Sequence, residues 1–178
     1  MKTNLKNTAL KLAITSLLTM GLTPSVIAGV IGGEVAEIND LQQTFVSNIT
    51  IVAGEAQADT TIMTGIINNN MEAGWNLTVS SANLGKLNRG AGGIGNEINY
   101  EYIQLVKQSG ILGADLVDPH AQLKDITGGS VNFDTGSGLA TSATEDYGFA
   151  LQISWKEDSS MLAGSYSDTI TLTLATDA

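Results

Sequence analysis

The sequence predicts an all-β protein that folds as a single Ig-like antiparallel β-sandwich. Long amphipathic helical patterns are scarce, and short alternating segments are separated by clusters of Gly, Asn and Ser. The clearest alternation runs from Tyr147 to Trp155, where five large apolar residues occupy every second position. A period of two places these five side chains on one face of a strand.

The last strand is expected near the C-terminus. Tyr166, Ile170, Leu172 and Leu174 share one parity, and Ser and Thr fill most of the other parity. The polar stretch from Lys156 to Ser165 separates this strand from the previous one. It predicts either a hairpin or a short crossover between two sheets.

Upstream strands are expected at three places. Residues 75–80 alternate apolar and polar side chains, residues 61–67 alternate around Gly65, and residues 45–52 are rich in β-branched side chains. Residues 98–106 fit either a strand or a short helix. Residues 82–96, which are rich in glycine, and residues 115–127 are expected to be long loops.

The predicted core takes the apolar residues on one face of each strand. They are Phe45, Ile49, Ile51, Ile62, Ile66, Trp75, Leu77, Val79, Tyr147, Phe149, Leu151, Ile153, Trp155, Ile170, Leu172 and Leu174.

The first 28 residues have the order of a secretory signal peptide. Three lysines lie within the first eleven residues, an apolar stretch runs from Leu12 to Leu22, and Val26-Ile27-Ala28 is a small-residue cleavage pattern. The apolar stretch is too short to span a bilayer. We therefore expect cleavage after Ala28, export through the periplasm, and a protein that is secreted or held at the cell surface.

Residues 29–178 then suffice for one domain with a hydrophobic core. The leader carries three of the eight basic residues and no acidic ones, so five basic and 18 acidic side chains remain, a formal net charge of −13. This charge opposes nucleic acid and anionic membranes as partners. Without cysteines, the exported domain must be held by its core alone. We expect no second apolar segment to span a membrane.

Two motifs suggest chemistry that their surroundings do not favour. Residues 90–95 fit G-x-G-x-x-G, but a dinucleotide site needs a strand directly before the motif and a helix directly after it. Residues 134–137 read Asp-Thr-Gly-Ser, which is similar to the motif of aspartic proteases. Those enzymes need two carboxylates, so this chain with one motif would have to work as a dimer. The simpler interpretations are a Gly-rich connector and a turn between strands.

Calcium is the one cofactor that the composition leaves open, because the chain is acidic and rich in oxygen ligands. The candidate ligands are Asp115, Asp118 and Asp134, although no calcium-loop spacing supports them. His120 is the only histidine, and a zinc site usually needs more histidine or cysteine than this. A solvated acidic surface is the simpler interpretation.

The segment around Trp75 (GWNLTVSSANLGKL) and the C-terminal segment (LAGSYSDTITLTLA) resemble a known group of proteins. They are similar to the closing elements of exported bacterial β-sandwich subunits of the spore-coat-U and archaic fimbrial-pilin type. The resemblance lies in a Gly-x-Tyr-x-Asp-x-(Val/Ile)-x-(Val/Leu) final strand, which here comprises Gly164, Tyr166, Asp168, Ile170 and Leu172. It implies a β-sandwich surface subunit, although this chain lacks the cysteine pair that those families often carry.

We therefore expect an exported structural subunit of a fibre, pilus or biofilm matrix, which is not an enzyme and associates with itself or with other surface subunits. The segment from Gly29 to Leu41 contains Val30, Ile31, Val35 and Ile38, and is too apolar for an idle tail. It pairs either with its own sheet or with the edge of a neighbouring subunit. The alternatives are a secreted calcium- or glycan-binding module and, third, a dimeric aspartic protease.

Overall fold

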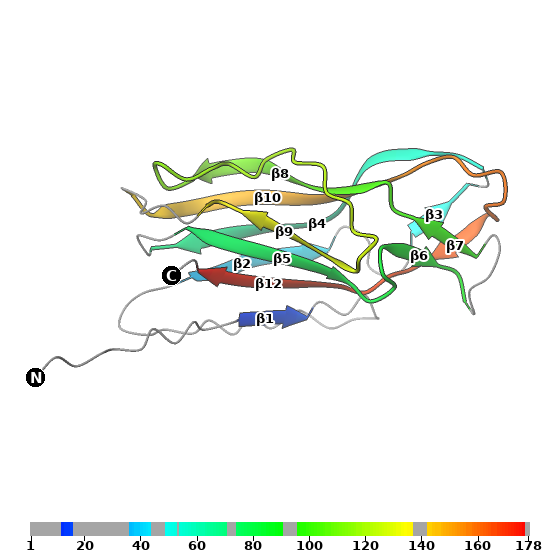
Figure 1. Ribbon diagram of the computed structural model, residues 1–178, viewed down its shortest axis with the longest axis horizontal. Helices are drawn as coiled ribbons and strands as arrows, with labels where there is room; N and C mark the ends of the chain where they lie inside the picture. Colours follow the sequence, from blue (N-terminus) through cyan, green and yellow to red (C-terminus); the bar gives the residue numbers. More distant parts are fainter. Residues whose placement is uncertain are drawn as a thin grey trace, which may run out of the picture.

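A computed structural model describes residues 12–15, 36–43, 49–52, 54–70, 74–90, 96–136 and 142–176. These residues form strands, turns and irregular connections, and none of them is helical. All strand pairs among them are antiparallel (Figure 1). The predicted all-β antiparallel class is confirmed.

The described residues contain twelve strands. They are β1 (Leu12–Thr15), β2 (Ala36–Gln43), β3 (Ile49–Ile51), β4 (Gln57–Asn69), β5 (Trp75–Ser81), β6 (Lys86–Asn88), β7 (Glu97–Asn99), β8 (Tyr102–Ile111), β9 (Ser130–Asp134), β10 (Thr144–Trp155), β11 (Gly164–Tyr166) and β12 (Ile170–Thr176).

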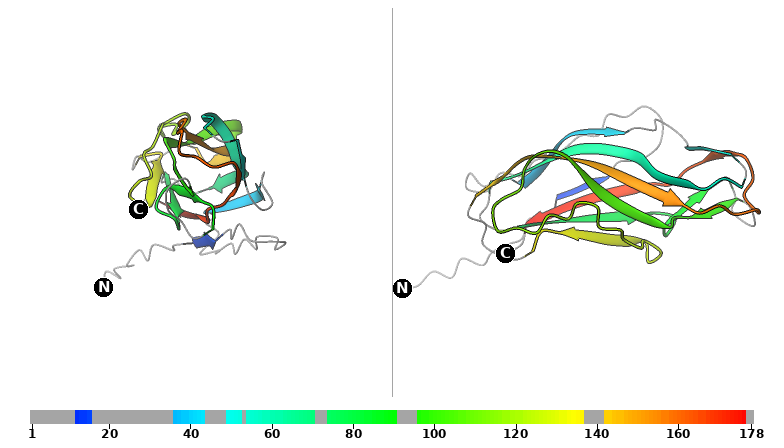
Figure 2. Two further views of the ribbon diagram at one scale, coloured as in Figure 1. Left: turned by 90° about the vertical axis from the view of Figure 1, so that its right-hand side faces the viewer. Right: turned by 90° about the horizontal axis from the view of Figure 1, so that it is seen from above.

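Two four-stranded sheets pack against each other as a sandwich (Figure 2). The first sheet has the strand order β1-β12-β5-β9, and the second sheet has the order β2-β4-β10-β8. Two small sheets, β11–β3 and β6–β7, lie at one end of the sandwich, on the right in Figure 1. The chain passes from β10 in the second sheet through β11 to β12 in the first. Of the two interpretations of residues 156–165, the crossover is therefore confirmed.

The core lies between the sheets, where period-two alternation places large side chains. All five large residues of β10 from Tyr147 to Trp155 are buried, as are the apolar residues predicted for β5 and β12. Further buried side chains were not part of the predicted core. They are Ile38, Met63, Ile67, Leu87, Ile98, Tyr100, Ile103, Leu105, Ile126, Phe133, Met161 and Tyr166.

The placement of Ile66 in the core was wrong, because β4 contains a bulge. The pairing with β10 skips one residue at Ile62. Two consecutive side chains, those of Ile62 and Met63, are therefore buried. Beyond the bulge the inward parity continues to Ile67, which leaves Ile66 half-buried on the outer face. A bulge shifts the side-chain parity of one strand relative to its partner.

Several segment predictions can now be compared with the structure. Residues 98–106, which fitted a strand or a helix, belong to β7 and β8. The expected loop 82–96 contains the short strand β6, whereas 115–127 forms only a single bridge, between Lys124 and Ile103. Of the expected strand 45–52, β3 occupies Ile49–Ile51; Phe45 and the side chains of Ile49 and Ile51 lie outside the described residues.

Candidate assembly edge

The two neighbours of β12 in the first sheet differ greatly. On one side β12 pairs with β5 over its full length, from Ile170 to Thr176. On the other side its partner among the described residues is β1, from Thr171 to Leu174. The residues of β1 belong to the segment that the sequence predicts to be a signal peptide. The partner of this edge is therefore a four-residue strand from the expected leader (Figure 1).

The edge of the second sheet lies beside this edge of the first. Its outermost strand, β2, pairs with β4 and lies against β12. In β2 the side chain of Ile38 is fully buried, opposite Ile67. Residues 36–43 therefore pair with the protein's own sheet, which is the first of the two alternatives expected for residues 29–41. The other three candidate assembly residues, Val30, Ile31 and Val35, lie outside the described residues.

The opposite side of the sandwich is closed by the β8–β9 connection, residues 112–129, which we call the edge loop. Ile103 and Lys124 exchange two backbone hydrogen bonds of 2.9 Å, and the N–H of Ala121 donates to the carbonyl oxygen of Leu105 at 2.8 Å. Near the other sheet, the N–H of Val117 donates to the carbonyl oxygen of Thr135 at 2.8 Å. Covering an edge in this way prevents it from pairing with another chain.

A buried carboxylate fixes the start of β12. Asp168 is 5% exposed, and its Oδ2 accepts hydrogen bonds from the hydroxyls of Ser81 at 2.5 Å and Tyr100 at 2.9 Å. Its Oδ1 accepts from the backbone N–H groups of Asn83 at 3.1 Å and Thr169 at 2.7 Å. A buried charge is tolerated only when donors satisfy it in this way.

This network connects three parts of the chain at the end of the sandwich that carries the small sheets. Ser81 ends β5, Tyr100 lies between β7 and β8, and Asp168 precedes β12. Burial raises the pKa of the Tyr100 phenol well above its usual range, and the neighbouring Asp168 charge and hydrogen bond raise it further. The network therefore orients β12 through a neutral phenol and a carboxylate.

The three calcium candidates do not form a cluster. Asp115 is exposed, with a left-handed backbone, and Asp134 accepts the N–H of Gly136 at 2.6 Å. Asp118 accepts the hydroxyl of Tyr147 at 2.7 Å. Within the described ranges, no three His, Cys, Asp or Glu residues gather to hold a metal ion. The Asp118 carboxylate thus has a structural partner of its own.

Asp134 of the Asp-Thr-Gly motif ends β9, Thr135 and Gly136 follow it without regular secondary structure, and residues 137–141 lie outside the described part of the chain. Asp134 is exposed, and Gly136 has a φ of 86°. Thr135 is fully buried: its hydroxyl accepts the N–H of Trp75 at 2.8 Å and donates to the Trp75 carbonyl oxygen at 3.0 Å. The threonine therefore holds the start of β5 against the end of β9.

The G-x-G-x-x-G motif connects two antiparallel strands, β6 and β7. The element after it is a strand instead of the helix that a dinucleotide site needs. Gly90 is exposed, and residues 91–95 lie outside the described part of the chain.

Two features of the sandwich edges could not be found from the sequence: the Asp168 network before β12 and the edge loop beside β8. Asp168 stood in the C-terminal motif, but its partners Ser81 and Tyr100 lie 87 and 68 residues away. The edge loop makes several of its contacts through backbone groups, at residues 117, 121 and 124, and these leave no residue pattern. His120 is exposed in this loop, and its Nδ1 accepts the N–H of Lys107 at 2.8 Å.

Comparison with protein families, with curated proteins and with solved structures found no match for this chain. Across the described residues there is no helix of the length and hydrophobicity needed to cross a membrane.

Proposed function

We propose that this protein is an exported structural subunit of a cell-surface or extracellular assembly, and that copies join by strand addition at the β12 edge. The observation that carries the proposal is the difference between the two sides of β12. Within the described part of the chain, this seven-residue strand is fully paired on one side and has a four-residue strand of the expected leader as its partner on the other.

Loss of the leader would leave β12 at the edge of its sheet. Unpaired backbone groups along such an edge are a ready template for another strand. The far side of the sandwich is covered by the edge loop, so addition would be directed to one side only. A single accepting edge favours an ordered assembly over uncontrolled aggregation.

The segment that would add is residues 29–35, directly before β2. These seven residues match the length of β12 and contain Val30, Ile31 and Val35. In β12 the side chains of Ile170, Leu172 and Leu174 are buried, and a donor strand would extend their apolar row. Backbone hydrogen bonds would supply affinity and alternate side chains would supply specificity.

This segment could pair with either of two β12 edges that have the same chemistry. It could fill the β12 edge of its own chain, which lies beside β2, or that of a neighbour. We propose the neighbour, since repetition of a head-to-tail contact does not close and gives a filament. Residues 29–178 have a formal net charge of −13, which suits a soluble precursor and opposes nucleic acid as the partner.

Size-exclusion chromatography with light scattering tests this proposal on residues 29–178 and on residues 36–178. The longer chain is expected to form species of high mass, and the shorter chain a folded monomer. Ile31→Asn with Val35→Asn should also abolish assembly, whereas the matched control Glu34→Gln should assemble normally. If residues 29–178 stay monomeric at every concentration, the proposal of a self-assembling subunit is wrong.

A further inference from the structure

The imidazole of His120 occupies the place of a strand partner at the β8 edge. Its Nδ1 accepts the backbone N–H of Lys107 at 2.8 Å, and the His120 side chain is otherwise exposed. Lys107 lies in the middle of β8. The other edge of β8 pairs with β10, and there Lys107 lies opposite Phe149. The outward N–H of this strand residue is therefore satisfied by a side chain of the edge loop.

This contact completes a regular row along β8. Ile103 pairs with Lys124 through two backbone bonds, Leu105 accepts the N–H of Ala121, and Lys107 donates to His120. These three residues of β8 are spaced by two, as the outward-facing groups of an edge strand are. At Ile103 and Leu105 the hydrogen-bond partner is a backbone group of the edge loop, which does not titrate. At Lys107 the partner is the imidazole of His120.

An imidazole can fill this role only in its neutral form. With Nδ1 as acceptor, the single ring proton lies on Nε2. Protonation converts both nitrogens into donors, so Nδ1–H would then face the N–H of Lys107. The hydrogen bond would be lost and replaced by a repulsion between two donors.

We propose that His120 is a pH-sensitive latch on the β8 edge, closed while the imidazole is neutral and released when it is protonated. Release frees the outward N–H of Lys107 and loosens the adjoining part of the edge loop. It thereby exposes a second strand edge, on the side of the sandwich away from β12. The closed state is favoured above the pH range in which an imidazole titrates and is weakened as the pH falls through it.

Three other titratable groups lie around this contact, on three different elements. The Lys107 ammonium of β8 lies 5.4 Å from the ring centroid of Tyr147 in β10 and 3.9 Å from the carboxylate of Asp118. Oδ1 of Asp118, in the edge loop itself, accepts both the Tyr147 hydroxyl and the backbone N–H of His120. Burial raises the pKa of Tyr147, so its phenol stays neutral throughout.

These groups hold the Asp118 carboxylate against the backbone of His120. His120 is also the only histidine of the sequence. A local opening of β8 between pH 7.5 and pH 5.5 would therefore report on this one side chain.

Hydrogen–deuterium exchange with mass spectrometry, corrected for the intrinsic effect of pH, tests the latch on the full chain. Peptides covering β8 should exchange roughly fivefold faster at pH 5.5 than at pH 7.5, which is the effect of losing one hydrogen bond of ordinary net strength. Peptides covering β5, a central strand, should not change. His120→Asn places an amide oxygen near the position of Nδ1, so this variant should stay protected at both pH values. His120→Ala removes the acceptor and should exchange rapidly at both.

Three results would overturn the proposal. They are equal exchange of wild-type β8 at both pH values, the same acid response in His120→Asn as in wild type, and an acid response that includes β5. The second would assign the response to the carboxylates, and the third would show global opening. None of these results depends on whether β12 accepts a strand, so this test stands apart from that of the proposed assembly.

Discussion

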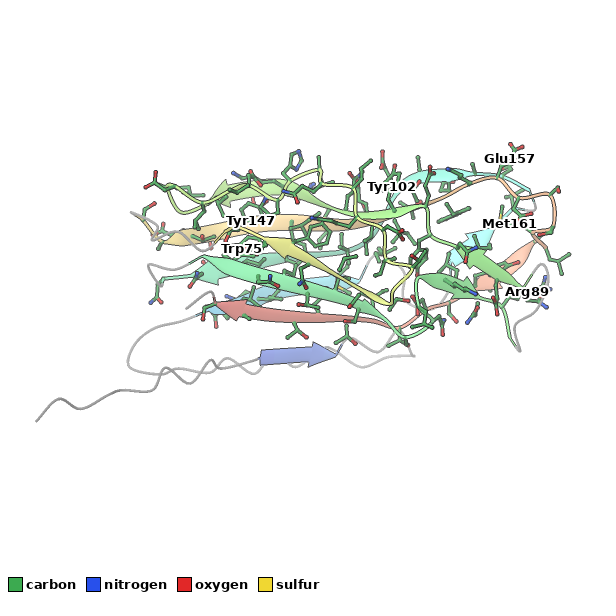
Figure 3. All side chains as sticks on the ribbon, viewed as in Figure 1. Trp75, Arg89, Tyr102, Tyr147, Glu157 and Met161 are labelled. Atoms are coloured by element: carbon green, nitrogen blue, oxygen red, sulfur yellow. The ribbon has the colours of Figure 1, made fainter. Side chains whose placement is uncertain are left out.

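Trp75 lies edge-on to Tyr147, with ring centroids 5.5 Å apart and an angle of 61° between the ring planes (Figure 3). Both side chains are fully buried, and they come from different sheets, since Trp75 begins β5 and Tyr147 lies in β10. Such a pair contributes about 0.5–1.5 kcal/mol beyond the burial of its area. The indole N–H of Trp75 has no hydrogen-bond partner among the described residues.

The two tryptophans are therefore expected to respond differently to replacement by phenylalanine. The Nε1 of Trp155 donates to the carbonyl oxygen of Glu55 at 3.2 Å, whereas that of Trp75 has no acceptor in the described part of the chain. Trp155→Phe should cost about 1 kcal/mol more than Trp75→Phe, which is the net value of one hydrogen bond. Either Trp→Ala change should cost about 3–5 kcal/mol. Urea unfolding followed by circular dichroism measures the free energy of unfolding of all four variants. Equal losses for the two Phe variants would contradict the role of the Trp155 hydrogen bond.

The Asp168 network is expected to be the most sensitive polar feature of the fold. Asp168→Asn replaces one acceptor oxygen by an amide nitrogen. Either the hydroxyls of Ser81 and Tyr100, which share Oδ2, or the backbone N–H groups of Asn83 and Thr169, which share Oδ1, would then lose their acceptor. The expected loss of unfolding free energy is about 2–4 kcal/mol. The control is Asp134→Asn, at an exposed carboxylate, which should change stability by less than about 0.5 kcal/mol. Similar losses in urea unfolding for the two variants would refute the role of the network.

Two buried phenols predict a loss of stability at high pH. Burial raises the pKa of Tyr100 and of Tyr147 above the unfolded value of about 10. The stability that this neutral form contributes is thus complete below about pH 10 and is lost as the pH rises towards the folded values. Each tyrosine should contribute a limiting slope of about 1.4 kcal/mol per pH unit. Urea unfolding at successive alkaline pH values should show a shallower slope for Tyr100→Phe and for Tyr147→Phe than for wild type, and equal slopes for all three proteins would contradict this account.

The alternating strands could be predicted from the sequence because their pattern is local. Phe149, Leu151 and Ile153 are buried whatever strand lies beside them, since a period of two fixes their common face. The inward face of β4 could not be predicted in the same way. Its bulge at Ile62 exists only in the pairing with β10, so Ile66 was given the wrong face.

The candidate edge was predictable only in part. The apolar segment from Gly29 to Leu41 was visible in the sequence, and one of its members, Ile38, proves to be a core residue of β2. The pairing of β1 with β12 joins residues about 160 positions apart, and no local pattern reports it. The covering of the β8 edge by the edge loop could not be predicted either, because Ala121 contacts β8 through a backbone N–H that any non-proline residue supplies.

Gly110 is expected to tolerate no side chain. Its φ is 82°, and a Cβ at this position would collide with the backbone carbonyl oxygen of Asp146, where β8 and β10 pair irregularly. Gly110→Ala should cost about 1–3 kcal/mol, because neither backbone can move away without breaking the ladder. Gly128 provides the control, since nothing lies within 4 Å of its Cβ position. Thermal unfolding that places both Ala variants close to wild type would show that the strand ends adjust freely.

Removal of the leader is expected to change the exposure of β12. N-terminal sequencing of exported protein should begin at Gly29, which follows the Val26-Ile27-Ala28 pattern. In the full chain, β1 covers residues 171–174, so hydrogen exchange there should be slow. In residues 36–178 neither the leader nor the donor segment is present, and the same peptide should exchange faster. The β5 strand is paired on both sides and serves as the internal reference.

Residues 29–178 distinguish the two destinations of the donor segment. If Gly29–Val35 fills the edge of its own chain, β12 should be protected to the same extent at every protein concentration. If the segment fills a neighbour's edge, protection should increase with concentration, because association follows mass action. The proposed subunit requires the second outcome. Equal exchange of β12 in all three chains would mean that its edge accepts no strand, and the assembly proposal would then lose the observation that supports it.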